Sequence, residues 1–355
     1  MLWFSIQSIG LFLLEILSTR DALLPYNGGE KVKIGFELKN GAIVETSEES
    51  ASILVYAAPN DREKQQIIQA LALDPYDLES ALDPEEISRV EFTPDRVSLI
   101  WKRPKSASFD EQLRLDVSSV GLFLYQDRLT AIMNEKAIPF TAKEFLGARS
   151  SVDVLLGFLH YTVHHYLAHL KMIKQLTIEL ESKISSSMEN RYLLQMFALS
   201  ESLIYYLNDI EANSTVLTKL RGSVEKLGLS KQRIESLDDI TLDNQQCARQ
   251  AQIYSTVLSG LMDARGTLIN NNMNVLLKNL TLINIIFLPL NLIASIGGMS
   301  EYTMMMKGID WKFAYALFSL AMVIIGLGTW FIIVWTLDKR KWKIKNRLHK
   351  LFSHK

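Results

Sequence analysis

The sequence contains very little cysteine, with only Cys247 among its 355 residues. A single thiol excludes a disulfide within the chain and a zinc site built from several cysteines, and it fits a reducing compartment. The sequence also lacks a phosphate-binding glycine loop, a nucleophile elbow, a zinc-protease helix and a kinase signature. We therefore do not expect an enzyme.

Charge is missing from two long segments near the C-terminal end. No charged residue occurs in 279–299 or in 313–337, and each segment is long enough to cross a hydrocarbon core of about 30 Å as a helix. Tryptophans flank the second segment as they do at membrane interfaces, at Trp311, Trp330, Trp335 and Trp342. Because a basic tail follows, we predict two transmembrane helices rather than a buried hairpin of a soluble protein.

The charges that are present divide unevenly. Residues 339–355 hold eight Lys or Arg and no acidic residue, whereas the rest of the chain holds 30 basic and 39 acidic residues. The positive-inside rule keeps this tail in the cytoplasm, and two crossings return the N-terminal part to the same side. We expect an inner (plasma) membrane protein with both termini cytoplasmic. The juxtamembrane tail favours contact with lipid over nucleic acid, so no nucleic-acid partner is expected.

The part of the chain before Pro139 alternates between strand-like and helical patterns. Asn60 with Glu63 three residues later predicts a capped helix, and Asp74 predicts a second one through Leu82. Strands are predicted over 31–38, 42–45, 53–57, 90–92, 97–101, 113–124 and 129–133. The apolar run 1–17 lacks a basic start and a small-residue cleavage site, so we interpret it as a buried or interfacial segment.

Long helical patterns follow, with breaks near 185–189 and 221–230. The third long helix starts near Lys231 and is expected to run unbroken into the first membrane span. The fold class is thus an α+β membrane protein. Its predicted parts are a cytoplasmic α/β domain (1–141), a stalk of long helices (142–275), a two-helix transmembrane domain (276–337) and a basic cytoplasmic tail (338–355).

Polar or small residues recur along the third helix at steps of four and three, which keeps them on one face over many turns. Polar side chains in a span face protein or water, and spacing alone leaves interhelical contacts and a pore equally open. A ring of identical helices would reconcile the two. The predicted pore-lining residues are Asp263, Asn270, Asn274, Leu277, Thr281, Asn284, Leu288, Asn291 and Ser295.

In such a ring each residue type has a distinct role. Amide and hydroxyl oxygens suit strongly hydrated cations such as Mg²⁺. Leu277 and Leu288 would form apolar constrictions, and Asp263 would form a carboxylate ring at the cytoplasmic mouth.

Residues 286–296, Ile-Phe-Leu-Pro-Leu-Asn-Leu-Ile-Ala-Ser-Ile, resemble the first-span motif of the CorA family of divalent metal ion transporters. Gly298, Met299 and Ser300 lie where that family has its Gly-Met-Asn selectivity motif. The resemblance covers most of the chain and includes ZntB-like relatives that carry zinc. It implies a homopentameric funnel whose stalk helices line the pore.

Two departures from the family pattern bear on the transported ion. Ser300 replaces the asparagine whose amide helps to bind the hydrated ion at the outer mouth, and Gly297 stands where an aromatic residue is usual. A serine ring would be shorter and wider, which leaves Mg²⁺, Zn²⁺, Co²⁺ and Ni²⁺ open as substrates. The alternative is a membrane-tethered sensor or scaffold that kept this architecture and lost conduction.

Candidate metal-sensing residues lie in the cytoplasmic part, and no cofactor is expected besides divalent cations as substrate or regulator. The family senses metal through carboxylates between subunits, for which Asp238 and Asp239 are candidates by position. Histidines form two pairs with i,i+4 spacing, which can place two imidazoles on one metal. No cysteine or carboxylate is expected to complete that site, so a solvated or inter-helix face is favoured for His160, His164, His165 and His169.

Overall fold

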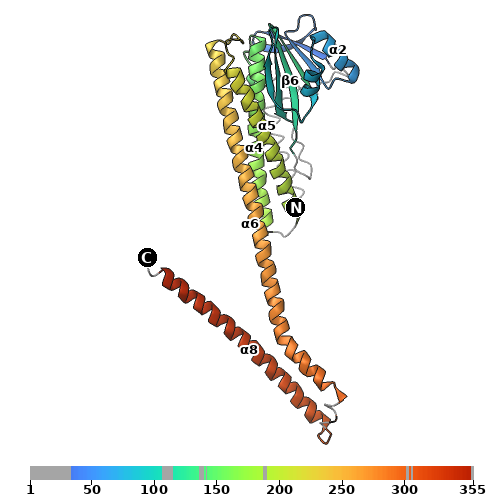
Figure 1. Cartoon of the computed structure of the whole chain (residues 1–355), viewed down its shortest axis with the longest axis vertical. Helices are drawn as coiled ribbons and strands as arrows, with labels where there is room; N and C mark the ends of the chain where they lie inside the picture. Colours follow the sequence, from blue (N-terminus) through green and yellow to red (C-terminus); the bar gives the residue numbers. More distant parts are fainter. Residues whose placement is uncertain are drawn as a thin grey trace. The chain divides into compact units, whose positions relative to one another are not determined.

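The computed structural model describes residues 33–105, 115–135, 140, 142–186, 190–300, 304 and 307–352. They form two compact units, one up to Met262 and one from Asp263 onward (Figure 1). The apolar run 1–17 interpreted above lies outside the described residues.

The described strands of the first unit form one seven-stranded sheet in the order β2-β1-β3-β7-β6-β5-β4. The pair β3 and β7 is parallel and the other pairs are antiparallel. All seven predicted strands are present, β3 with its predicted ends and the others with shifted ends. They are β1 (Lys33–Lys39), β2 (Ala42–Thr46), β3 (Ile53–Ala57), β4 (Arg89–Phe92), β5 (Arg96–Pro104), β6 (Val117–Tyr125) and β7 (Arg128–Met133).

Two short helices, α2 (Asp61–Leu71) and α3 (Pro75–Leu82), cover one face of the sheet. Their starts are fixed by the predicted caps. The Asn60 side-chain oxygen accepts hydrogen bonds from the second and third backbone N–H groups of α2, and Glu63 accepts from the Asn60 N–H at 2.7 Å. Asp74 caps α3 with a single bond, since its side-chain oxygen accepts from the Tyr76 N–H at 2.9 Å.

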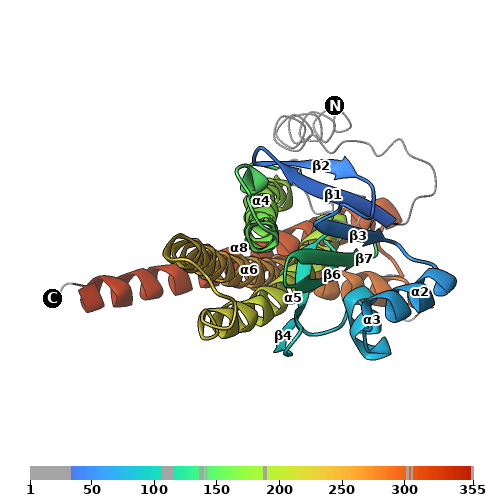
Figure 2. The same cartoon turned by 90° about the horizontal axis from the view of Figure 1, so that it is seen from above.

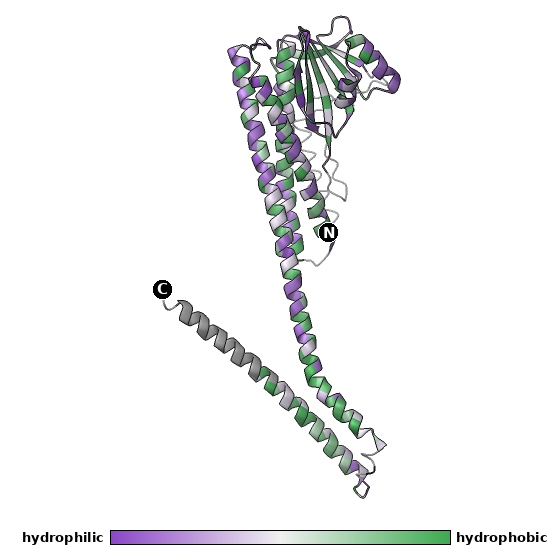
Figure 3. Cartoon of the chain, viewed as in Figure 1, coloured by the Kyte–Doolittle hydropathy of each residue, from purple (hydrophilic) through white to green (hydrophobic). Residues whose placement is uncertain are grey.

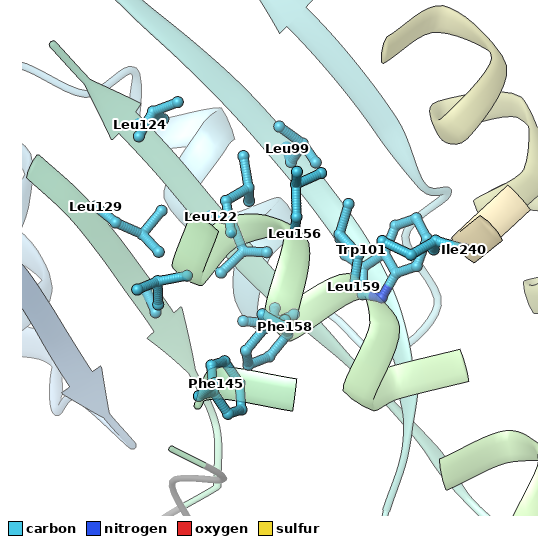
Figure 4. Close-up of a cluster of buried hydrophobic side chains, with 14 of the residues drawn as sticks. Leu99, Trp101, Leu122, Leu124, Leu129, Phe145, Leu156, Phe158, Leu159 and Ile240 are labelled. Carbon is cyan, nitrogen blue, oxygen red and sulfur yellow. The ribbon is translucent and has the colours of Figure 1, made fainter. Parts of the chain in front are cut away.

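Three long helices lie on the other face, as the view from above shows (Figure 2): α4 (Ser151–Ser186), α5 (Asn190–Arg221) and the first part of α6 (Lys231–Gly297). A 3₁₀ turn, η1 (Lys143–Phe145), precedes α4. The alternation of β5 and β6 points Leu99, Trp101 and Leu122 at α4, where they meet Leu156 and Leu159 in a hydrophobic core (Figure 4). The predicted helix breaks therefore separate elements that share one core.

Buried amides tie these helices to the sheet and to each other. The Asn213 side chain of α5 is fully buried, and it bonds the backbone N–H and carbonyl of Lys102 in β5, at 3.2 and 2.9 Å, and the Ser88 hydroxyl at 2.8 Å. Asn244 of α6 donates to the Ile210 carbonyl of α5 at 3.0 Å. An unpaired buried polar group lowers the stability of the fold, so these hydrogen bonds fix the positions of the helices relative to the sheet.

The second unit contains the end of α6 and helix α8 (Trp311–Phe352). Both helices contain stretches that are long and apolar enough to cross a membrane, and these stretches are largely green in Figure 3. The side chains of the apolar stretches are not buried within the chain. That exposure is what a lipid-facing hairpin requires, whereas the core hairpin of a soluble protein would be covered.

Candidate functional site

The predicted pore-lining residues form a polar stripe along α6, within the second unit. The stripe begins at Asp263, ends at Ser295, and every residue in it is exposed in the single chain. Within the apolar stretch of α6, this stripe carries the side chains of Thr281, Asn284 and Asn291. Uncovered amides in hydrocarbon are costly, so this face must meet water or another protein surface.

The opposite face of α6 packs against α8. A Cβ atom placed on Gly297 would lie 2.7 Å from the Phe318 ring, and one on Gly326 would lie 3.5 Å from Leu290. Partly buried positions recur at helical spacing on both partners. They are Leu282, Ile286, Pro289, Leu290, Ile293 and Gly297 on α6, and Ala314, Phe318, Met322, Ile325, Gly326 and Thr329 on α8.

The stripe and the α8-facing side point in nearly opposite directions. At about 100° of rotation per residue, the centre of the stripe lies roughly 170° around α6 from the centre of the face that packs on α8. Within the second unit, α8 is therefore not the partner of Asn284 and Asn291. Among the described residues of this unit, contacts to α8 therefore do not explain why these amides occur in the span.

The stripe offers oxygen atoms as its polar ligands inside the apolar stretch. The Thr281 hydroxyl donates its proton to the Leu277 carbonyl at 2.8 Å, which leaves its oxygen lone pairs directed away from that bond. Asparagine carbonyl oxygens and threonine hydroxyl oxygens are ligands of hard cations such as Mg²⁺ and Ca²⁺. Leu277 and Leu288 interrupt the polar positions with apolar side chains, as hydrophobic constrictions do.

The predicted selectivity residues lie where α6 ends. The Gly298 N–H donates to the carbonyls of Ala294 and Ser295, both at 3.2 Å, and the Met299 N–H donates to the Ile296 carbonyl at 3.0 Å. These bonds satisfy carbonyls that a helix end would otherwise leave open. The triplet that ends with Ser300 thus sits at the terminus of the polar stripe.

A family model described as CorA-like Mg²⁺ transporter protein matches residues 48–341. The matched range runs from the sheet through both apolar helices. The chain belongs to this CorA family. The resemblance seen in the first-span motif is thereby confirmed, and membrane transport of divalent metal ions is the activity of the family.

Individual relatives agree with this assignment. The cobalt/magnesium transport protein CorA of Methanocaldococcus jannaschii is 26% identical over 278 residues, which cover 74% of this chain and 86% of the relative. The protein of the same name from Thermotoga maritima is 24% identical over 285 residues, covering 78% and 79%. The complete structure of the CorA magnesium transporter from M. jannaschii superposes with a TM-score of 0.69 at 22% identity, covering 85% and 97%. The CorA-like fold is confirmed.

The CorA resemblance implies an aromatic residue at position 297, where this chain has a glycine. Gly297 lies close to the Phe318 ring, which leaves no room there for a larger side chain. We expect Gly297→Tyr to lower the stability of the hairpin by about 1–3 kcal/mol, because the new side chain would overlap the Phe318 ring. Adding Phe318→Ala should restore the loss. The measurement is thermal unfolding of the full chain in detergent.

The control for this pair is Gly328→Tyr, since no described atom lies within 4 Å of a Cβ placed on Gly328. This control should unfold at the temperature of the parent. A Gly297→Tyr variant as stable as the parent, or one that Phe318→Ala fails to rescue, would show that the two positions do not share space.

The two predicted carboxylate sensors are exposed at the start of α6. The Asp238 carboxylate accepts hydrogen bonds from Arg221 of α5 at 2.5 and 3.2 Å, so it already holds a cationic partner within the chain. Asp239 faces solvent. Their role in sensing metal stays a prediction.

The four histidines of α4 divide into two pairs with different surroundings. His169 is buried and its Nδ1 lies 2.8 Å from the Tyr206 hydroxyl of α5, and burial lowers its pKa to about 4. The His165 ring packs beside it, with ring centroids 4.5 Å apart. This pair belongs to the packing between helices.

His160 and His164 form the other pair, and a carboxylate does lie beside them. The expectation that no carboxylate completes a site was wrong, because Asp243 of α6 approaches both rings. Asp243 lies 83 residues from His160 in the sequence. No local spacing could have indicated it, since the contact exists only after α4 and α6 pack together.

Proposed function

We propose that identical copies of this chain assemble around an axis into a channel or transporter that moves divalent cations across the inner membrane. The observation that carries the proposal is the oxygen-bearing stripe of α6, which lies opposite the face that packs on α8. Among the described residues, Asn284 and Asn291 lie on the face turned away from α8, which supports neighbouring copies and water as their partners. Rings of such oxygens around a shared axis form a selective path for cations.

The family resemblance supports five copies, with the first apolar stretch inside and α8 outside. In this arrangement both termini lie in the cytoplasm, the basic tail 338–355 contacts the lipid surface, and the loop 300–312 faces outward. The apolar side chains of α8 then meet hydrocarbon, which accounts for their exposure in the single chain.

Mg²⁺ and Co²⁺ are the first ions to consider, because two relatives are named cobalt/magnesium transport proteins. The oxygen ligands of the stripe suit Mg²⁺, which keeps several of its waters. The Ser300 hydroxyl would replace an amide at the outer mouth and widen the ring. We expect this change to relax the choice of ion towards Co²⁺, Ni²⁺ and Zn²⁺.

The test is competitive uptake of Mg²⁺, Co²⁺, Ni²⁺ and Zn²⁺ by one preparation of the full chain in proteoliposomes. Uptake of at least one ion above that of protein-free vesicles is expected. Restoring the family residue with Ser300→Asn should shift the preference towards Mg²⁺. Assembled protein that moves none of the four ions under an inward gradient would contradict the proposal.

That negative result would favour the second candidate, a membrane-tethered sensor or scaffold, which the serine at position 300 supports. In that case Ser300→Asn would leave uptake at the background, and the cytoplasmic unit would respond to metal without any flux.

A further inference from the structure

A compact group of metal-ligating side chains lies in the first unit, away from the polar stripe. His160 and His164 are one turn apart on α4, and their rings lie 4.2 Å apart by centroid. Both present Nε2 to one carboxylate oxygen of Asp243 on α6, at 3.3 Å from His160 and 3.6 Å from His164. Two long helices therefore supply three ligands to one point.

The spacing of these atoms matches tetrahedral coordination. Zinc bonds to imidazole nitrogen and carboxylate oxygen are about 2.0–2.2 Å long, which places neighbouring ligand atoms of a tetrahedron roughly 3.3–3.6 Å apart. The two nitrogen-to-oxygen distances fall at this separation, and all three ligand atoms lie within 4.8 Å of one another. A small closure of the two rings would complete the site.

A fourth side chain holds one ring in the orientation that metal binding needs. Glu144 of η1, whose side chain is only 5% exposed, lies 2.8 Å from Nδ1 of His164. A hydrogen bond from Nδ1 to this carboxylate directs the Nε2 lone pair of His164 towards Asp243. Such carboxylate–histidine pairs commonly surround zinc, because they fix the tautomer and make the ligand more basic.

The surroundings of His160 favour its uncharged imidazole. Burial and the neighbouring His164 lower the pKa of His160, so its ring is ready to donate a lone pair near neutral pH. Burial alone would raise the pKa of Glu144, but the hydrogen bond with His164, a backbone hydrogen bond and the nearby charges of His164 and Lys143 together lower the net pKa. The carboxylate that orients His164 is therefore ionised.

We propose that His160, His164 and Asp243 bind one Zn²⁺ ion per chain, with Glu144 as the positioning residue. The three ligands leave a fourth position for water, and each is about one-third exposed, so the ion can exchange with the cytoplasm. Imidazole ligands select zinc and similar transition metals over Mg²⁺. The ion would join α4, which packs on the sheet, to α6, which continues into the polar stripe.

The site is independent of the transport proposal, because it is defined by binding and lies outside the stripe. The experiment titrates Zn²⁺ into the full chain in detergent against a chromophoric chelator of known affinity. The parent should bind one ion per chain in a step that excess Mg²⁺ does not displace. If the Zn²⁺ ion were instead bound on an axis shared by several copies, fewer than one ion would bind per chain. The variants described below would then not remove that ion.

Three variants and one matched control decide the assignment. His160→Ala and Asp243→Asn should each abolish the step, and Glu144→Gln should weaken it by about 10- to 100-fold. Glu235→Gln removes a carboxylate about two turns earlier on α6, at an exposed position outside the metal sites considered above, and should bind as the parent does. Co²⁺ bound to the parent should show the visible absorption of a four-coordinate ion, and this should vanish in His160→Ala.

Circular dichroism of each variant establishes that it is folded. His160→Ala removes a partly exposed ring, so this variant tests binding even if Asp243→Asn unfolds. The absence of a one-per-chain step in the parent would overturn the proposal. Unchanged Zn²⁺ affinity in folded His160→Ala would overturn it as well.

Discussion

Replacing Asn291 with leucine is expected to reduce divalent-cation uptake to the level of protein-free vesicles. Asn291 lies in the stripe of α6, on the face turned away from α8, and a ring of its amides would replace part of the hydration shell of a passing ion. A ring of leucines at this level would offer no oxygen ligand. It would add an apolar constriction close to the one proposed at Leu288. The measurement is metal uptake into proteoliposomes that contain equal amounts of assembled protein.

The matched control is Asn279→Leu, which makes the same chemical change on the same helix. At about 100° per residue, Asn279 lies on the α8-facing side of α6 rather than in the stripe. This variant should transport like the parent. Equal loss of uptake in both variants would mean that leucine harms the helix generally, and unchanged uptake in Asn291→Leu would mean that ions do not pass along the stripe.

Replacing Asn213 with alanine is expected to destabilise the first unit by about 2–4 kcal/mol. The change leaves the backbone N–H and carbonyl of Lys102 and the hydroxyl of Ser88 buried without their partner. Each unsatisfied buried group costs about 1–3 kcal/mol, with partial relaxation reducing the sum. In a unit of this size, we expect the unfolding temperature to fall by about 4–16 °C.

Asn208→Ala is the control for this change, because Asn208 lies on the same helix but is exposed. Thermal unfolding of the full chain by circular dichroism should show the parent temperature for Asn208→Ala and a clearly lower one for Asn213→Ala. Equal temperatures for the two variants would show that the amide does not hold α5 against β5.

The parts of the fold that depend on neighbours in sequence could be predicted. The capping box of Asn60 and Glu63 acts over three residues, and the strand pattern of β3 acts over five, so both are present in the chain itself. The order of the strands is a different matter. The parallel pairing of β3 with β7 brings together segments about 75 residues apart, and nothing local to Ile53 or Leu129 specifies it.

The polar stripe was predictable for the same local reason, since residues three and four apart share one face of a helix. The face of α6 that packs on α8 could not be predicted, because leucine and isoleucine occur on both faces of the helix. The contact between Gly297 and Phe318 decides which face is covered. The sequence therefore predicted which residues lie together, and the packing shows which way they point.

The histidines show the limit of local reasoning most clearly. Sequence spacing pairs His160 with His164 and His165 with His169. Only tertiary packing places Asp243 beside the first pair and Tyr206 beside the second. The role of Asn213 could not be predicted from the sequence either. Asn213 stabilises the fold because α5 packs on β5, where its side chain bonds the Lys102 backbone.

Labelling of single cysteines along 281–295 of α6 tests the central claim most directly. The native thiol gives no background, because Cys247 is buried and burial raises its pKa to about 12. In proteoliposomes, a charged, water-soluble thiol reagent should label cysteines placed at Asn284, Leu288, Asn291 and Ser295. Cysteines at Leu282, Ile286 and Ile293 should stay unlabelled against α8. If the α8-facing positions react instead, or none reacts in protein that transports, then α6 does not turn its polar stripe towards water.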